Sequence, residues 1–149
     1  MGATGVVVLV VAIVAANAVI WVAVLAWLRG RLRRTDAELR ALVKGEERFL
    51  VEPSVGNYRG ASARFGKVKG TGVAALTDRR VLCAKAVGAL IDVPLTDVVG
   101  VREDNWFLRS YNGRPHVILK LRDGVEVGFQ VGDHARWMEI LRARVAAPQ

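Results

Sequence analysis

The chain has 149 residues, of which 52% are hydrophobic, and its 22 Lys or Arg and 14 Asp or Glu give a formal net charge of +8. All of these charged side chains lie at or after Arg29, so residues 1 to 28 carry none, and this asymmetry excludes a plain soluble globule. The length excludes two large domains, and the supply of Val, Leu and Ile after residue 45 argues against disorder.

The first predicted element is an apolar helix over residues 6 to 28, which read VVVLVVAIVAANAVIWVAVLAWL with Asn17 as the only strongly polar side chain. Such a helix would extend about 34 Å, enough to cross a hydrocarbon core of about 30 Å. Basic side chains follow it at once but do not precede it: Arg29, Arg31, Arg33 and Arg34. The positive-inside bias then predicts a single-pass protein of the plasma membrane with its N-terminus outside and residues 29 to 149 in the cytoplasm.

A cleaved secretory signal is the alternative, because Ala16-Asn17-Ala18 offers a small-x-small cleavage site. However, no basic stretch precedes the apolar run, and cleavage after Ala18 would leave a bare apolar terminus. We therefore favour three regions: a tail and transmembrane helix (1–28), a basic juxtamembrane segment with a short linker helix (29–45), and a folded domain (46–149).

The predicted span is either a plain anchor or a surface for helix pairing. Three alanines and one amide side chain lie on nearly the same face of this helix: Ala12, Ala16, Asn17 and Ala23. Such a face can support close packing between helices, including a homodimer.

After the span, Thr35-Asp36-Ala37-Glu38 has the spacing of a capping box, which predicts that a helix begins there. We expect this linker helix over residues 36 to 44, separate from the span or continuous with it, with Gly45 as its stop signal. Its apolar face is expected to dock on the domain or lie on the bilayer.

The clearest strand signals are late in the chain. Alternating apolar residues over 117–121 and 125–131 flank Asp123-Gly124, a pattern typical of a β-hairpin. Asn112-Gly113 similarly predicts a turn between a strand over 106–111 and the strand that follows. Residues 106 to 131 are thus predicted to be a three-stranded antiparallel meander.

Further short strands are expected upstream, at 49–51, 72–76, 80–85, 89–93 and 98–102. Asp133 is placed to cap a final helix in which Trp137, Met138, Leu141 and Val145 share a face. We therefore predict a mainly β domain, an antiparallel barrel or sandwich with a C-terminal helix at one open end.

Three segments of this domain carry a family resemblance: the turn Leu76-Thr77-Asp78-Arg79-Arg80, the step from Val93 to Val98 (VPLTDV), and a last helix containing Trp137. Together they resemble the bacterial pleckstrin-homology-like, or GRAM-type, domains over about residues 46 to 146. The resemblance implies a seven-stranded bent barrel capped by one α-helix, in modules that bind lipid headgroups, peptides or proteins at membranes.

Phosphoinositide-binding members of that family carry basic residues in the loop after the first strand. The matching stretch here is residues 58 to 70, with Arg59, Arg64, Lys67 and Lys69, although Lys69 stands where the stricter lipid-binding pattern has Arg. Residues 29 to 69 hold 11 Lys or Arg and 5 Asp or Glu, while residues 70 to 149 hold 11 and 9. This excess indicates either attraction to an anionic leaflet or a topology signal alone. Nucleic acid is not expected as a partner, because no basic recognition helix is present.

No constellation of residues predicts catalysis, a cofactor or a metal site. Gly70-Thr71-Gly72-Val73-Ala74-Ala75 fits a dinucleotide fingerprint, but no crossover helix is expected after it. Cys83 is expected in the core, and His116 and His134 on the surface. We therefore predict a non-catalytic module for anionic membrane lipids or a protein partner; the alternatives are an assembly subunit that pairs through its span and, more remotely, a nucleotide-binding enzyme.

Overall fold

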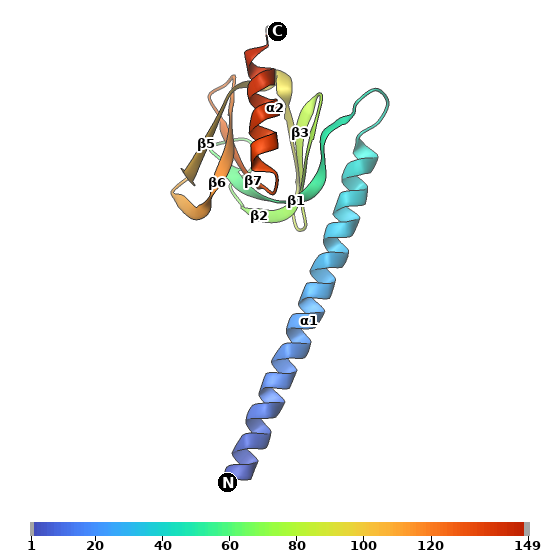
Figure 1. Cartoon of the computed structure of the whole chain (residues 1–149), viewed down its shortest axis with the longest axis vertical. Coiled ribbons are helices and arrows are strands. Elements are labelled where there is room, and N and C mark those ends of the chain that lie inside the picture. Colours follow the sequence, from blue (N-terminus) through green and yellow to red (C-terminus); the bar gives the residue numbers. More distant parts are fainter. Residues whose placement is uncertain (1, 148–149) are drawn as a thin grey trace.

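A computed structural model describes residues 2 to 147 as one long helix, seven strands, a short 3₁₀ turn and a closing helix (Figure 1). In chain order the elements are α1 (Ala3–Leu42), β1 (Phe49–Ala61), β2 (Gly70–Thr77), β3 (Arg80–Lys85), β4 (Leu90–Pro94), η1 (Leu95–Asp97), β5 (Val98–Phe107), β6 (Ser110–Leu121), β7 (Glu126–Val131) and α2 (His134–Ala146).

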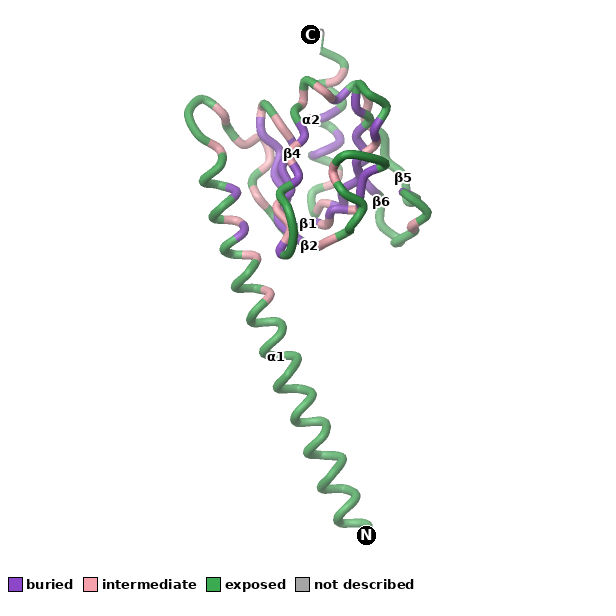
Figure 2. Tube along the Cα trace, turned by 180° about the vertical axis from the view of Figure 1, so that it is seen from behind, coloured by how far each residue is buried: buried purple, intermediate pink, exposed green. Residues whose placement is uncertain are grey.

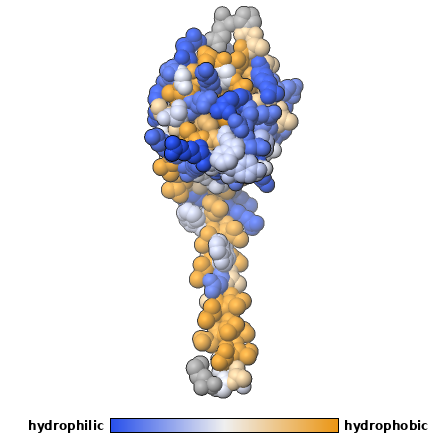
Figure 3. Space-filling view, turned by 90° about the vertical axis from the view of Figure 1, so that its left-hand side faces the viewer, coloured by the Kyte–Doolittle hydropathy of each residue, from blue (hydrophilic) through white to orange (hydrophobic). Residues whose placement is uncertain are grey.

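The long helix α1 joins the predicted span and the predicted linker helix without a break. Among the described residues it is the one helix long and apolar enough to cross a membrane, and none of its apolar stretch is buried. Figure 3 shows this stretch as a hydrophobic stem below a domain whose visible surface is largely hydrophilic.

The capping-box interpretation is wrong, because the helix has no start at Thr35. The Thr35 hydroxyl lies in mid-helix and donates to the carbonyl oxygen of Arg31, one turn earlier, at 2.9 Å. A Thr side chain has this backbone acceptor available only inside a continuing helix. The helix ends at Leu42, and Gly45 with φ of +68° follows in the connector to β1.

The strands form one antiparallel sheet in the order β4-β3-β2-β1-β7-β6-β5, curled into a half-barrel. Strand β1 is the longest, and it joins the two halves of the sheet, β2–β4 and β5–β7. Phe49 pairs with Thr77 of β2, and Ala61 pairs with Val127 of β7. The predicted fold class, a mainly β domain with a curled antiparallel sheet and a C-terminal helix, is confirmed.

The meander of β5, β6 and β7 is present, but its first turn lies elsewhere than predicted. Phe107 pairs with Ser110, so the two-residue turn is Leu108-Arg109 rather than Asn112-Gly113, which lies inside β6. The strands predicted separately over 98–102 and 106–111 are therefore one strand, β5, followed by the start of β6. The second turn, at Asp123-Gly124, is as predicted, with the Leu121 amide donating to Val125 at 2.8 Å.

Burial of Phe107 accounts for the position of the first turn. Its side chain is 3% exposed and lies over Gly128 of β7, where an added Cβ would be 2.4 Å from the ring. A register shift of one residue would turn this ring to the other face of the sheet and expose it.

The main core fills the concave side of the sheet and is closed by α2. Trp137, Met138 and Leu141 of this helix are buried there, together with Tyr58 and Phe129. Asp133 caps α2, since its carboxylate accepts from the Arg136 amide at 3.3 Å. Cys83 belongs to this core, as predicted.

A second, smaller core lies on the convex side, where the last turns of α1 cover β2 and β3 (Figure 2). Leu39 is fully buried there against Val73, Ala75 and Leu82. These two strands are therefore buried on both faces, which explains why their apolar residues run consecutively instead of alternating. Docking on the domain, one of the two expected roles of the linker's apolar face, is observed.

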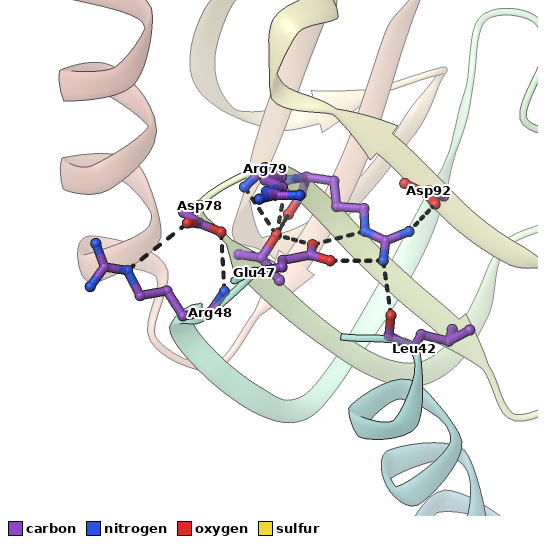
Figure 4. A network of polar contacts seen from close by, with 8 residues as sticks. Leu42, Glu47, Arg48, Asp78, Arg79 and Asp92 are labelled. Atoms are coloured by element: carbon purple, nitrogen blue, oxygen red, sulfur yellow. Dashed lines mark hydrogen bonds and ion pairs between the residues drawn. The ribbon is translucent and has the colours of Figure 1, made fainter. Parts of the chain in front are cut away.

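An ionic network fixes the end of α1 to the sheet (Figure 4). The Arg80 guanidinium bonds both Glu47 oxygens, at 2.9 and 3.0 Å, and reaches Asp92 on β4 at 2.8 Å and the carbonyl oxygen of Leu42 at 3.1 Å. Thr77 donates to Glu47 at 2.7 Å. The Glu47 side chain is only 7% exposed, and its pairing with Arg80 holds its pKa below the usual range.

Substitution of Gly72 tests the close approach of β2 and β3. A Cβ on Gly72 would lie 2.1 Å from the carbonyl oxygen of Ala84, so we expect Gly72→Ala to lower the free energy of unfolding by about 2 kcal/mol or more. Gly100→Ala is the matched strand control, because its Cβ would meet Lys120 at an ordinary 3.5 Å. Denaturant unfolding of the full chain in detergent measures both, and equal losses would contradict the steric explanation.

Acid should weaken the fold through Glu47. Because its pKa is lowered in the folded chain, its contribution to stability is full above the unfolded value near 4.5 and is lost as the pH falls through the folded value. We expect the gap in Tm between wild type and Glu47→Gln to narrow as the pH falls through this range. Glu46→Gln, whose side chain is 95% exposed, should show a smaller gap at neutral pH.

Candidate functional site

The basic residues predicted to face lipid divide between two places in the fold. Four lie on consecutive exposed turns of α1: Arg29, Arg31, Arg33 and Arg34. Of these, Arg31 turns toward the domain, and its Nε donates to the carbonyl oxygen of Ala86, in the β3–β4 turn, at 2.8 Å. This contact holds one edge of the domain beside the helix, three residues after Leu28.

The loop between β1 and β2 covers residues 62 to 69, and its second half lies at the same edge. Lys67 and Lys69 are exposed, and between them the carbonyl oxygen of Val68 accepts from Lys85 Nζ at 3.3 Å. Lys85 ends β3, directly before Ala86. We call this side of the domain the basal edge: residues 66–69, 85–89 and the β5–β6 turn at 108–109.

Tyr58 holds the loop in place from within. Its hydroxyl donates to the carbonyl oxygen of Gly66 at 2.6 Å, while Lys85 Nζ lies 5.4 Å from the centre of its ring. Burial is the main reason that the pKa of Tyr58 is raised to about 12, so the hydroxyl keeps its proton and remains a donor at physiological pH.

Arg59 lies in β1 and is half-buried, not on a free loop as expected. Its guanidinium donates to Ser110 Oγ at 2.8 Å and to His116 Nε2 at 3.3 Å. His116 in turn contacts the carbonyl oxygen of Asp104 through Nδ1 at 2.9 Å. These partners require the neutral tautomer of His116, with its proton on Nδ1.

The expectation that His116 is a surface residue is wrong, since it is fully buried. Burial, and then the nearby charges of Arg59 and Lys69, lower its pKa. His134, at the start of α2, is partly exposed, and its Nε2 lies 2.7 Å from Glu103. Among residues 2 to 147 no group of three or more His, Cys, Asp or Glu is placed to hold a metal ion.

Arg64 belongs to a different part of the surface. It pairs with Asp123 of the β6–β7 turn at 3.0 Å and lies over the ring of Phe65. The structure thus brings Lys67 and Lys69 together with Arg31 and Arg59 near the basal edge, and separates Arg64 from them. Lys85 was not predicted as a site residue. Its place beside the loop depends on the pairing of β3 with β2, and no local motif indicates it.

The small-residue face of the apolar stem is exposed along α1: Ala12, Ala16, Asn17 and Ala23. The Asn17 side-chain amide donates to the carbonyl oxygen of Ile13, one turn earlier, at 2.9 Å. This bond satisfies part of the amide within its own helix. Helix pairing through this face stays a prediction.

The glycine motif at residues 70 to 75 lies inside β2, between β1 and β3, and no helix begins there. A dinucleotide site of this kind needs glycines that open a helix after a parallel strand. Gly72 instead permits close contact with β3, as its distance to Ala84 requires.

A scan of family models and a search of curated proteins found no match to this chain. Its fold and its side-chain contacts are therefore the basis for the function proposed below.

The buried His116 gives the fold a second pH dependence. Because burial lowers its pKa from the usual 6.5, its contribution to stability is full above 6.5 and declines as the pH falls below that value. We expect the Tm of wild type to fall with acidification in this range, and the slope to be smaller in His116→Gln. An unchanged slope in His116→Gln would contradict the buried neutral state.

Proposed function

We propose that this chain is a single-pass membrane protein whose cytoplasmic domain is a non-catalytic binding module for the anionic headgroups of the membrane in which it is anchored. The N-terminus lies outside the cell, the apolar part of α1 crosses the plasma membrane, and the arginines from Arg29 onward remain on the cytoplasmic side. No cofactor is required.

We further propose that the domain is pleckstrin-homology-like. The curled seven-stranded antiparallel sheet and the buried Trp137 of the closing helix are compatible with this family. The segment from Leu76 to Arg80 forms the tight turn between β2 and β3, and Val93 to Val98 forms the step through η1 between β4 and β5. Both are the roles that the resemblance implies.

One series of contacts carries the proposal of lipid binding. Arg31 on α1 bonds Ala86, Lys85 bonds Val68, and Val68 lies between Lys67 and Lys69. Arg31 follows Leu28, the last apolar residue of the stem, by a rise of about 4.5 Å along the helix. This closeness of the basic loop to the end of the apolar stem supports the proposal that the loop meets the headgroups of the same membrane.

The distribution of charge also favours lipid binding at the basal edge. The segment from residue 29 to 69 has 11 basic and 5 acidic side chains. Basic groups near an anionic leaflet contribute about 1 kcal/mol each, an attraction that falls off over a Debye length of about 8 Å at physiological salt. Only groups held near the leaflet gain this energy, so the docking of α1 on the domain matters as much as the charge.

A protein partner remains a second candidate, because β4 and β5 are the edge strands of the sheet. An exposed strand edge can pair with an extended segment of another protein. Self-association through Ala12, Ala16, Asn17 and Ala23 would suit such an assembly role.

Charge reversal at the loop tests the lipid proposal. We expect the full chain, released in detergent and titrated with phosphatidylglycerol or phosphatidylcholine, to bind the anionic lipid preferentially in native mass spectrometry. The double variant Lys67→Glu and Lys69→Glu should weaken phosphatidylglycerol binding about tenfold or more, since each reversal removes a favourable contact of about 1 kcal/mol.

The double variant Lys44→Glu and Lys120→Glu is the control, because it makes the same change in net charge in the α1–β1 connector and on β6. Added salt should reduce the preference of the wild type. Equal binding of the two lipids by the wild type, or equal losses in both double variants, would reject the proposed headgroup site.

A further inference from the structure

Three large apolar side chains are exposed together at the tip of the β5–β6 hairpin, residues 106 to 111. Trp106 is 58% exposed, Leu108 41% and Tyr111 59%. Trp106 and Tyr111 are cross-strand partners whose ring centres are 5.6 Å apart. These side chains lie outside the core, so folding of the domain does not account for them.

The turn at this tip has an unusual backbone. Leu108 and Arg109 have φ of +46° and +61°, a region that side chains other than Gly, Asn and Asp rarely adopt. Two-residue hairpin turns of this kind favour Asn-Gly, which the chain has only a few residues later, within β6. The hairpin thus presents a large apolar and a basic side chain at its tip at a cost in backbone strain.

Buried contacts at the base of the tip keep its side chains outward. Phe107 is buried over Gly128, and Ser110 Oγ accepts the bond from Arg59 at 2.8 Å. One methyl group of Leu108 lies near Gly60, as does the backbone of Lys67. The tip is therefore continuous with residues 66–69 of the basal edge, which we call the lysine loop because they include Lys67 and Lys69.

The orientation of the tip follows from the docking of α1. Figures 1 and 2 both show the β5–β6 turn at the side of the domain that faces the apolar stem, the side on which the β3–β4 turn also lies. The β3–β4 turn is held to α1 by Arg31, just beyond the end of the apolar stretch. Trp and Tyr favour this depth of a bilayer, where a ring can be half in hydrocarbon and half in water.

The charges around the tip fit an anionic surface. Arg109 is exposed at the turn, and Arg114 is exposed on β6. A neighbouring carboxylate, Asp104, is already bonded to the Trp106 amide at 2.9 Å and to Arg102 at 3.1 Å. Its charge is therefore partly offset within the protein.

We propose that the tip formed by Trp106, Leu108 and Tyr111 is an interfacial wedge that inserts into the same leaflet from which α1 emerges. The protein then holds the bilayer at two points, and the lysine loop between them is kept at headgroup depth. This inference rests on the proposed membrane anchoring, but it concerns side chains other than Lys67 and Lys69, the neighbouring residues of the proposed headgroup site.

Depth-dependent quenching tests the wedge. The full chain with Leu108→Cys, carrying a fluorescent label, is reconstituted into nanodiscs of phosphatidylcholine, with and without phosphatidylglycerol, that contain lipids brominated near the top of the acyl chain. Lys44→Cys, exposed in the α1–β1 connector at the far end of the domain, is the matched control. The native Cys83 is fully buried and should not react.

We expect the label at residue 108 to be quenched several-fold more than the label at residue 44. Adding Trp106→Ser and Tyr111→Ser should reduce this difference while leaving the Tm within a few degrees, because both side chains are already exposed. Quenching that requires phosphatidylglycerol supports a wedge that needs anionic headgroups, and quenching in both lipids supports one driven by apolar contact.

Equal quenching at residues 108 and 44 in nanodiscs that contain the protein would overturn the wedge alone. A chain that fails to enter nanodiscs would contradict the proposed anchoring itself. Protection of the residue 108 label in native membranes combined with no quenching in nanodiscs would overturn the lipid wedge in favour of a protein partner.

Discussion

The position of the whole domain depends on the contact between the last turns of α1 and the outer face of β2 and β3. Leu39 is fully buried there, and complete burial of a Leu side chain contributes about 1.5 to 3 kcal/mol. Arg80 adds a hydrogen bond to the last turn of the helix, and Arg31 adds one from the helix to the basal edge. With these contacts at both ends of the docked segment, the orientation of the sheet relative to the apolar stem is set by packing and not by a flexible linker.

Elements that are marked by a local pattern could be predicted from the sequence alone. An uncharged apolar run, the Asp123-Gly124 turn and an amphipathic last helix containing Trp137 each identified an element without reference to the rest of the chain. The errors arose where a local signal competed with a distant contact. Thr35 has the side chain of a helix cap, but docking of Leu39 on the sheet favours a continuous helix in which that hydroxyl bonds backward. Asn112-Gly113 suits a hairpin turn, but burial of Phe107 against Gly128 sets the register.

The candidate site was less accessible from sequence than the fold. The basic residues of the first loop could be found by composition, but their grouping depends on partners far along the chain. Arg59 bonds Ser110 and His116, and Arg64 bonds Asp123. One usable signal was overlooked: the apolar residues of β2 run consecutively through Val73 to Leu76, and an antiparallel strand of this kind needs cover on both faces. That pattern already implied that another element, here α1, lies across the convex side of the sheet.

The double burial of β2 and β3 also bears on how the protein is made. Along the chain α1 precedes every strand, so the helical surface on which these strands pack is synthesised before they are. If the apolar stem enters the bilayer first, the sheet assembles beside a fixed template at the membrane surface. Proteolytic cutting in the connector after Leu42 would separate the template from the sheet and uncover Val73, Ala75 and Leu82, a face prone to self-association. The last turns of α1 and the outer face of the sheet therefore share one buried surface, so the folded unit extends beyond the strands into the helix that precedes them.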